Sequence, residues 1–223
     1  MNELITYLPS AGKATRLKGI PKFYLPINEN NNLINYHVEN LNEIKDNQIL
    51  IATNEINYDS LKESFENEKI IVISSNSMVE TVYKSLDLKK GLHLVVMPDT
   101  YFHDYKVIKQ KIDKINNSDF DIVLGLWKIR EDQFGKLGQC KLNDGKVEIV
   151  IDKDPECKEP YAWGTILWKN SFNKYIQPSD NHFGTTINRA LEHGMKVGYI
   201  ISDSEYFDCG TFYEYKNLIN SFS

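Results

Sequence analysis

A basic segment rich in small residues follows the first apolar run of the chain. Residues 8–27 read LPSAGKATRLKGIPKFYLPI. A turn of small residues after a strand allows backbone N–H groups to approach phosphate oxygens. Arg16 and Lys22 can donate charge-assisted hydrogen bonds to the outer phosphates of a triphosphate. The segment therefore predicts phosphate binding, with a tight strand-to-helix turn carrying exposed basic residues as the alternative. The small residues of the turn are Ser10, Ala11 and Gly12.

The turn matches neither of two common phosphate-binding loops. The dinucleotide pattern GxGxxG needs three glycines, and residues 10–16 hold only Gly12. The P-loop pattern needs Ser or Thr directly after its lysine, and Lys13 is followed by Ala14. Lys13 remains a nucleotide-binding candidate as part of this turn.

Two carboxylates follow later apolar runs. Asp99 comes after the run Leu92–Met97, and Asp208 lies in YFDCGTFYEY after the run Val197–Ile201. Ligands bind open α/β sheets at the carboxyl ends of the strands, where carboxylates commonly hold Mg²⁺ beside a triphosphate. Taken singly, each acid has a local alternative. Asp99 suits a turn in Pro-Asp-Thr, and Asp208 suits a loop before a helix that Thr211 caps.

The elements that must position these residues alternate between strands and helices. Short β-branched apolar runs without clean alternation predict strands that are buried on both faces. These runs are Leu4–Leu8, Ile49–Ala52, Ile70–Ile73, Leu92–Met97 and Ile122–Leu126. Helices are predicted between them, at Leu33–Ile44, Tyr58–Phe65, Met78–Leu88 and Tyr105–Ile115. The alternation indicates βαβ units and an α/β fold whose central sheet is mostly parallel and flanked by helices.

After residue 127 the pattern changes. Two short runs flank NDGK, an Asp-Gly hairpin signal, and a glycine at position 194 can end a helix. We expect one α/β domain over residues 1–223, with a mixed second half. Its predicted elements are the strands Gln139–Leu142, Val147–Ile151, Trp163–Trp168 and Val197–Ile201 and the helices Thr185–Glu192 and Thr211–Ile219.

The composition excludes several classes of protein. The 223 residues carry a net charge of −5, which argues against a nucleic-acid partner. The three cysteines form no CxxC pair, so neither a disulfide framework nor a zinc site is expected. The N-terminus lacks the basic region of a signal peptide, and the longest apolar run, Leu92–Met97, is too short to span a membrane. We expect a cytoplasmic protein without a membrane partner.

The basic segment resembles the N-terminal signature of the sugar-1-phosphate nucleotidyltransferases, the family of the glucose-1-phosphate thymidylyltransferases. Its pattern is roughly two small residues, G-x-G-T-R-L, a spacer and P-K-x-L-x-P-[IV]. Ala14 stands where the second glycine is usual, and the spacer after Leu17 is short. The resemblance spans about residues 4–215. The matching residues are Gly12, Thr15, Arg16, Leu17, Pro21, Lys22, Leu25, Pro26 and Ile27.

This resemblance implies a fold and a catalytic set. The fold is a Rossmann-like nucleotidyltransferase fold with a nucleotide-binding half at about 1–127 and an acceptor-binding half at about 128–223. Arg16 and Lys22 would act on the triphosphate. Asp99 and Asp208 would be the catalytic pair that holds Mg²⁺, since the family's late motif, aromatic-x-D-x-G-T, is matched from residue 207 to 211.

The remaining matches concern the acceptor and the base. In IDKDPECKEPYAWGTILW, Lys153 resembles a lysine that contacts the acceptor phosphate, with Asp152 where the family has Glu. Gly164 resembles a glycine that lets the acceptor lie close. Ser77 lies in the turn that reads the nucleotide base in the family. It can also be the N-cap of a helix whose third residue is Glu80, a capping box.

The implied reaction joins an NTP to a sugar 1-phosphate, releasing pyrophosphate and an NDP-sugar, with Mg²⁺ as cofactor. Another small phosphorylated alcohol, such as choline phosphate, would use the same anion sites and give a CMP-type activated product. Family frequency favours a pyrimidine nucleotide. The short C-terminal end suits a monomer or a homodimer.

Two other functions are alternative interpretations of this sequence. A GT-A glycosyltransferase needs a DxD motif, and Asp119-Phe-Asp121 and Asp152-Lys-Asp154 are candidates. A non-catalytic homologue could bind a nucleotide or a sugar as a sensor. Retention of both acids argues against the sensor, because binding alone does not need two metal ligands.

Overall fold

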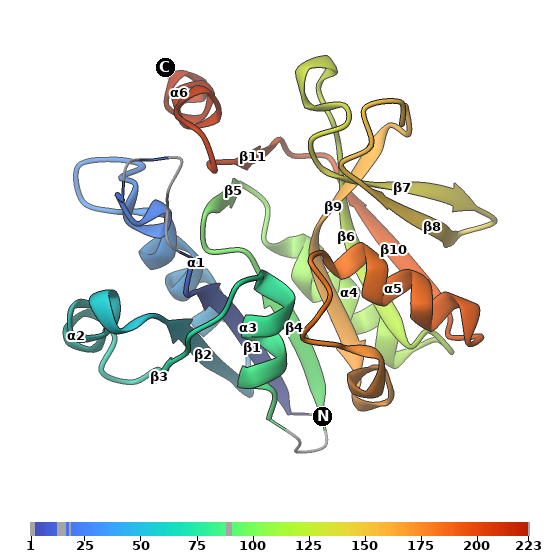
Figure 1. The fold of residues 1–223 in the computed structure, drawn as a ribbon, viewed down its shortest axis with the longest axis horizontal. Helices are drawn as coiled ribbons and strands as arrows, with labels where there is room; N and C mark the ends of the chain where they lie inside the picture. Colours follow the sequence, from blue (N-terminus) through green and yellow to red (C-terminus); the bar gives the residue numbers. More distant parts are fainter. Residues whose placement is uncertain (1–2, 13–16, 18, 88–90, 223) are drawn as a thin grey trace.

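The computed structural model describes residues 3–12, 17, 19–87 and 91–222. This part of the chain forms an α/β structure with a large central sheet and a small second sheet (Figure 1). The strands are β1 (Leu4–Ser10), β2 (Asn47–Thr53), β3 (Lys69–Val72), β4 (Leu92–Val96), β5 (Thr100–Phe102), β6 (Ile122–Lys128), β7 (Gly138–Asn143), β8 (Lys146–Asp152), β9 (Tyr161–Lys169), β10 (Val197–Ser202) and β11 (Tyr206–Asp208).

Six α-helices and several 3₁₀ turns connect the described strands. Side chains of Asn32, Asn54, Ser77 and Thr211 accept hydrogen bonds from the first turns of α1, α2, α3 and α6, the usual N-cap arrangement. The helices are α1 (Leu33–Asn42), α2 (Glu55–Ser64), α3 (Met78–Ser85), α4 (Lys106–Asn116), α5 (Phe183–Glu192) and α6 (Phe212–Ser221), and the 3₁₀ turns are η2 (Lys22–Tyr24), η3 (Glu131–Gln133) and η4 (Asn170–Tyr175).

The first half of the chain builds parallel βαβ units. The large sheet has the order β3-β2-β1-β4-β9-β6-β10-β8-β7, and β1 pairs in parallel with both β2 and β4. The chain therefore moves outward from β1 to β3 and then returns to the other side of β1. Such a reversal leaves a crevice at the carboxyl ends of the two central strands, where open α/β sheets bind ligands. Here the two strand ends are those of β1 and β4.

The second half adds antiparallel strands, as its changed pattern predicts. β9 runs antiparallel between β4 and β6, while β10 continues parallel to β6. The Asp-Gly turn joins β7 and β8, and Asp144 and Gly145 take φ values of 47° and 73°. A turn with positive φ at both central residues favours an Asp-Gly pair. Gly194, with φ 80°, follows α5 and ends it.

Alternate residues of the buried strands face two hydrophobic clusters, one on each side of the sheet. Leu4 and Leu8 of β1 pack in the cluster that contains α1, α2 and α4, whereas Ile5 and Tyr7 pack in the cluster that contains α3 and α5. Burial on both faces explains the near-continuous apolar runs of the central strands. The predicted fold class, a mixed and mostly parallel sheet flanked by helices, is confirmed.

Three predicted details are wrong. β3 is not buried on both faces, because it is the edge strand of the sheet and leaves Val72 45 % exposed. α2 begins at Glu55, three residues before the prediction, because Asn54 caps it. α3 ends at Ser85 instead of Leu88, which lies outside the described residues.

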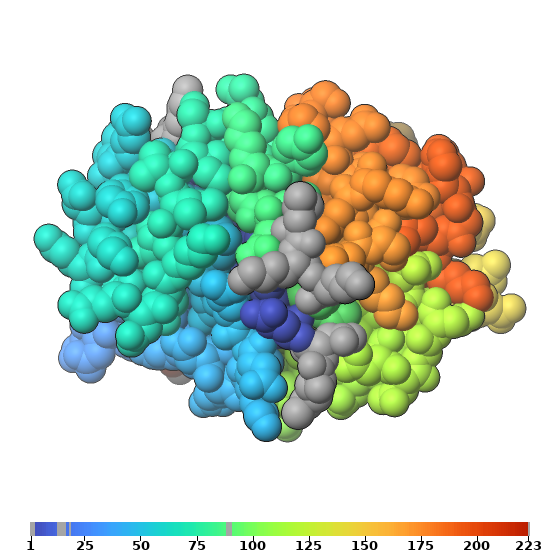
Figure 2. Space-filling model, turned by 90° about the horizontal axis from the view of Figure 1, so that it is seen from below, coloured from blue at the N-terminus to red at the C-terminus, as the bar shows by residue number. Residues whose placement is uncertain are grey.

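The small sheet was not predicted. β5 and β11 pair antiparallel and face the crevice at the carboxyl ends of the large sheet's parallel strands (Figure 1). Figure 2 shows the opposite end of the molecule, where residues from the two halves meet side by side as blue-green and orange surfaces. Within the described ranges, none of the helices combines the length and apolar character needed to cross a bilayer.

Candidate active site

The small sheet brings the two predicted metal ligands together. Asp208 is paired in register with Thr100, directly after Asp99, and the Cys209 amide donates to the Asp99 carbonyl over 3.0 Å. Acids that are 109 positions apart in the sequence (208 − 99) therefore lie close together, Asp208 at the end of β11 and Asp99 directly before β5. Both side chains line the same cavity.

Lys22 pairs with Asp99 and lies near Asp208. Its Nζ lies 3.0 Å from Asp99 Oδ2, and both side chains are 18 % exposed. A Cβ built on Gly210 would lie 2.9 Å from Asp208 Oδ1 and 3.4 Å from Lys22 Nζ, so this glycine lies between them. The Gly210 amide also donates to Asp208 Oδ1 over 3.1 Å. Pro21, with φ −62°, precedes η2 and sets the direction in which Lys22 leaves the chain.

A cavity of about 390 Å³ opens beside this cluster, and residues of both halves line it. A second cavity of about 550 Å³ shares Lys136, Leu137, Lys153 and Asp208 with the first, so the two adjoin. The first cavity is lined by Lys22, Asn76, Met78, Met97, Asp99, Thr100, Lys136, Leu137, Gly138, Asp152, Lys153, Trp163, Asn181, His182, Phe183, Tyr206 and Asp208.

Lys153 lines both cavities. It follows the last residue of β8 with φ 53°, a left-handed conformation that is uncommon for a residue with a side chain. Such local strain is retained where the surrounding structure enforces it, and it is frequent at binding sites. The Lys153 amide donates to the Leu137 carbonyl over 3.3 Å, which ties the residue to the loop before β7.

Asp152 lines the cavity next to Lys153, between two glycines. A Cβ on Gly138 would lie 2.4 Å from Asp152 Oδ1, and one on Gly184 would lie 2.0 Å from Oδ2. Burial raises the pKa of the Asp152 carboxyl, and the neighbouring His182, Trp163 and Gly184 amide oppose that rise. A carboxylate surrounded in this way can accept hydrogen bonds from a hydroxylated ligand.

The predicted glycine turn ends β1 at the same edge of the sheet. Ser10 is buried, and its hydroxyl donates to the Leu8 carbonyl over 3.3 Å, while the Ala11 carbonyl accepts from Asn54 over 3.5 Å. Among the described residues, none has an atom within 4 Å of a Cβ built on Gly12. Lys13 and Arg16, together with Ala14 and Thr15, lie outside the described residues, and their roles stay predictions.

The neighbours of Gly164 and Ser77 in the structure were not predicted from the sequence. Gly164 is buried beneath Tyr206, whose ring carbon Cε2 would lie 2.4 Å from a Cβ. The glycine thus admits the Tyr206 ring, and its contact with an acceptor stays a prediction. The Ser77 hydroxyl accepts from the Glu80 amide over 3.0 Å and donates to the Asp180 carbonyl over 3.0 Å.

The predicted capping box is present only in part. Glu80 Oε2 accepts from the amide of Asn76 over 2.7 Å, one residue before the N-cap. Lys84 pairs with Glu80 over 2.6 Å and is the first cause that lowers the pKa of that carboxyl. Asn76 and Met78, on either side of Ser77, line the cavity in its place. Neither was among the residues that the sequence singled out.

A buried network supports β5 from behind. His37 of α1 is fully buried and contacts the Thr100 carbonyl through Nε2 at 2.8 Å and the Tyr105 hydroxyl through Nδ1. Burial lowers the pKa of His37 to about 4, opposed by the Thr100 carbonyl and the Asp99 charge. Tyr36 donates to the Phe102 carbonyl over 2.9 Å. The backbone that carries Asp99 is therefore held by neutral hydrogen-bonding groups.

The acids fit a magnesium site. Mg²⁺ is usually bound by one or two carboxylates, with phosphate oxygens and water completing its coordination. Asp99 and Asp208 supply two carboxylates beside a cavity with room for a ligand. Burial is the main cause that raises the pKa of Cys209, and both of these carboxylates add to the rise, so the site concentrates negative charge. In the described ranges, no group of three or more His, Cys, Asp and Glu side chains is arranged to hold a metal ion.

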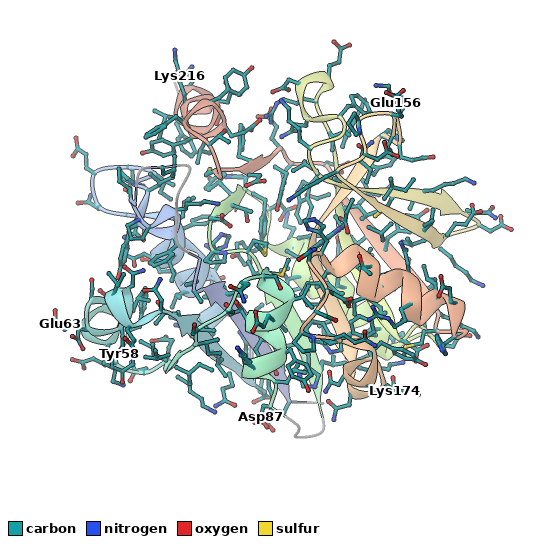
Figure 3. The ribbon with its side chains drawn as sticks, viewed as in Figure 1. Tyr58, Glu63, Asp87, Glu156, Lys174 and Lys216 are labelled. Carbon is teal, nitrogen blue, oxygen red and sulfur yellow. The ribbon has the colours of Figure 1, made fainter. Side chains whose placement is uncertain are left out.

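Of the two predicted DxD motifs, the first makes contacts away from the cavity, whereas Asp152 of the second lines it. Asp119 pairs with Lys196, and Asp121 Oδ2 accepts from the Lys196 amide over 3.0 Å, at the start of β6 rather than at its carboxyl end. Asp154 accepts from the Glu156 amide over 2.9 Å in an exposed turn. Figure 3 shows Glu156 at the outer edge of the molecule, far from the centre, as are Lys174 and Lys216.

Solved structures match the chain along almost its full length. A protein assigned as a glucose-1-phosphate thymidylyltransferase from Bacillus anthracis, in complex with a sucrose, has a TM-score of 0.83 at 17 % identity and covers 98 % of this chain and 94 % of its own. The chain has the sugar-1-phosphate nucleotidyltransferase fold. No protein-family model and no curated protein matches the sequence.

Two further structures share this nucleotidyltransferase fold at similarly low sequence identity. UDP-glucose pyrophosphorylase from Acinetobacter baumannii has a TM-score of 0.76 at 16 % identity, covering 100 % of this chain and 93 % of its own. The inositol-1-phosphate CTP transferase of T. maritima has a TM-score of 0.76 at 13 % identity, covering 98 % and 95 %. The names of these proteins include different bases and different phosphorylated acceptors.

Proposed function

We propose that the protein is a Mg²⁺-dependent nucleotidyltransferase that joins an NTP to a sugar 1-phosphate or to another small phosphorylated alcohol. The single observation that carries this proposal is the pairing of β5 with β11. It places Asp99 and Asp208 in the lining of one cavity at the carboxyl edge of the sheet, where Lys22 pairs with Asp99. The nucleotidyltransferase fold supports the same proposal, because the neighbours named above carry such activities.

The chain's own residues would act mainly by positioning two anions. A phosphate oxygen of the acceptor attacks the α-phosphorus of the NTP, a P–O bond forms, and the bond to pyrophosphate breaks in line. Mg²⁺ held by Asp99 and Asp208 would neutralise charge that develops on the phosphates. Lys22 would bind the phosphates from the opposite wall, and Lys153 would hold the attacking phosphate. Preorganised charges of this kind supply most of the catalysis in phosphoryl transfer.

The acceptor would extend from Lys153 toward Asp152. The carboxyl of Asp152 is held between Gly138 and Gly184 and faces the same cavity as Lys153. This geometry suits a hydroxylated acceptor whose phosphate meets the lysine and whose hydroxyl groups donate to the carboxylate. Glucose 1-phosphate and inositol 1-phosphate share that chemistry, and we propose this class ahead of choline phosphate, which lacks free hydroxyl groups.

The test is release of pyrophosphate from each of ATP, GTP, CTP, UTP and dTTP with Mg²⁺ and a panel of glucose 1-phosphate, inositol 1-phosphate and choline phosphate. The account expects release with one triphosphate and one hydroxylated acceptor, and loss of that release in Asp99→Asn. Cleavage of a nucleotide sugar to nucleoside diphosphate, without pyrophosphate release from any pair, would favour the glycosyltransferase. Binding without either reaction would favour the sensor.

A further inference from the structure

One hydrogen bond joins the two walls of the cavity at Ser77. Its Oγ donates to the carbonyl oxygen of Asp180 over 3.0 Å, across 103 positions of the sequence, while the same oxygen accepts from the Glu80 amide. Asn76 and Met78 line the cavity on one side of this bond, and Asn181 and His182 line it on the other. We call this contact the Ser77–Asp180 clasp.

The nucleotide side of the clasp is rigidly attached to α3. Lys84 donates to the Ser74 carbonyl over 2.7 Å and to Glu80 Oε1 over 2.6 Å, and the Asn76 amide donates to Glu80 Oε2 over 2.7 Å. The Ser75 hydroxyl lies 2.6 Å from that of Thr81. A displacement of residues 74–77 must therefore move the first turn of α3, and with it the Ser77 hydroxyl.

The acceptor side is equally fixed to α5. The buried Asp180 carboxylate accepts two hydrogen bonds from Arg189, at 2.7 and 2.8 Å, and one from Thr186 at 2.7 Å. A bidentate arginine pair of this kind fixes orientation as well as distance. The Asp180 carbonyl is thus held in a defined position relative to α5, whose first turn lies against the Asp152 carboxyl at Gly184. Figure 1 shows α3 and α5 beside each other on the same side of the sheet.

We propose that the Ser77–Asp180 clasp couples the two substrate subsites, so that a nucleotide bound against residues 74–78 orders residues 177–184 for the acceptor. Ser77 is then a positioning residue that acts through Asp180 and α5 without touching either substrate. The inference rests on the proposed function for the identity of the two ligands. A single hydrogen bond can transmit a coupling of at most about 13-fold in affinity, because its full strength counts only if one of the two ligation states breaks it.

Three substitutions at position 77 separate the clasp from the helix cap. Ser77→Thr keeps a hydroxyl that can donate and accept, so it retains both contacts. Ser77→Asp keeps a good N-cap acceptor for the Glu80 amide but has no donor for the Asp180 carbonyl at neutral pH. Ser77→Ala loses both contacts. Ser85→Ala is the matched control, because it removes a hydroxyl of α3 that bonds within its own helix, to the Thr81 carbonyl.

The experiment is amide hydrogen exchange of the full chain, followed by mass spectrometry on peptides covering 74–80 and 177–184. Without ligand, we expect exchange in 177–184 to accelerate by about threefold or more in Ser77→Asp and Ser77→Ala, and to stay at the wild-type rate in Ser77→Thr and Ser85→Ala. Equal rates in wild type and Ser77→Asp would overturn the clasp. This arm needs no substrate and therefore does not depend on the proposed function.

The second arm adds Mg²⁺ with the triphosphate that most raises the melting temperature. Wild type and Ser77→Thr should then slow exchange in both peptides, whereas Ser77→Asp should slow it in 74–80 alone. Slowing of 177–184 in Ser77→Asp to the wild-type extent would overturn the coupling. If none of the five triphosphates slows exchange in the wild type, the proposed function and the coupling both fail, while the contact itself is judged by the first arm.

Discussion

The large sheet and the small sheet differ in what holds them and in what they do. Central strands of the large sheet are buried on both faces by helices and read as apolar runs. β5 and β11 are three residues each, and they carry or adjoin the two acids of the candidate active site. The large sheet provides the stable support, and the small sheet places the charged groups at its edge.

This difference implies that stability and activity can be changed separately. A substitution inside the large sheet should lower the free energy of unfolding without altering the charges at the cavity. A substitution at the small sheet's acids should remove transition-state stabilisation while the core stays intact.

Trp168→Ala should have the largest effect on stability. Trp168 of β9 is fully buried, stacks with Tyr7 and His93, and donates from Nε1 to Asn173 over 2.7 Å. Truncation of such a side chain costs about 3–5 kcal/mol, or about 6–20 °C in melting temperature for a domain of this size. Thermal unfolding checks this value. Ile56→Ala, at a side chain that is 90 % exposed, should change stability by no more than about 0.5 kcal/mol.

Asp99→Asn, Asp208→Asn and Lys22→Ala should each lower turnover by at least about 10²-fold, which corresponds to about 2.7 kcal/mol of transition-state stabilisation. Their melting temperatures should stay close to the wild-type value, because none of the three side chains belongs to either large hydrophobic cluster. Pyrophosphate release by the purified variants is the measurement, with exposed Asp59→Asn as the control. Near-normal turnover in any of the three would remove that residue from the site.

Acid should destabilise the protein, because it favours protonation of His37, the buried histidine that supports β5. The pKa of His37 falls from 6.5 to about 4 on folding, so between these values the unfolded state binds a proton that the folded state does not. The free energy of unfolding should therefore decrease as pH falls from 6.5 to 4, by up to about 1.4 kcal/mol per pH unit from this group. Urea unfolding at several pH values measures the slope.

His37→Gln should flatten this pH dependence, because it removes the titrating group while keeping an amide that can donate to the Thr100 carbonyl. His103→Gln, at an exposed histidine of the same segment, should leave the slope unchanged. An unchanged slope in His37→Gln would show that β5 is not held by a neutral histidine.

Gly145→Ala should have the smallest effect, about 1 kcal/mol, because its φ of 73° is unfavourable for a residue with a Cβ although no atom lies within 4 Å. Gly145→Asn should lose less, since asparagine tolerates this conformation better. The β7–β8 turn is far from the acids, so turnover should be unaffected. A drop in turnover larger than about twofold would contradict the separation of the two sheets.

The same two sheets explain what the sequence could predict. The runs at Leu4–Leu8 and Leu92–Met97 gave β1 and β4, and the Asp-Gly turn gave the β7–β8 hairpin, because burial and turn conformation leave local signals. β5 and β11 leave none, since their pairing depends on contacts that are about 100 positions apart. The two acids were nevertheless predicted as a pair, through the resemblance rather than through any pattern of the strands themselves.

Other parts of the site could not be predicted from local sequence patterns either, because they depend on contacts between distant parts of the chain. Ser77 has a recognisable N-cap pattern, but its bond to Asp180 depends on how the two halves meet. Asp152 is visible beside Lys153, whereas its confinement by Gly138 and Gly184 appears only when β7, β8 and α5 are assembled. The support that His37 gives to β5 could not be predicted either, because in the sequence His37 is one polar residue on an otherwise apolar helix face.

The proposed magnesium–triphosphate site can be tested by thermal unfolding of wild type and Asp99→Asn with Mg²⁺ and each of the five nucleoside triphosphates. A triphosphate at about 100 times its Kd should stabilise the folded state by about 2.7 kcal/mol, a shift of about 5–11 °C for a domain of this size. We expect one triphosphate to produce this shift in the wild type and a clearly smaller one in Asp99→Asn. Equal shifts in both proteins, or none with any triphosphate, would contradict it.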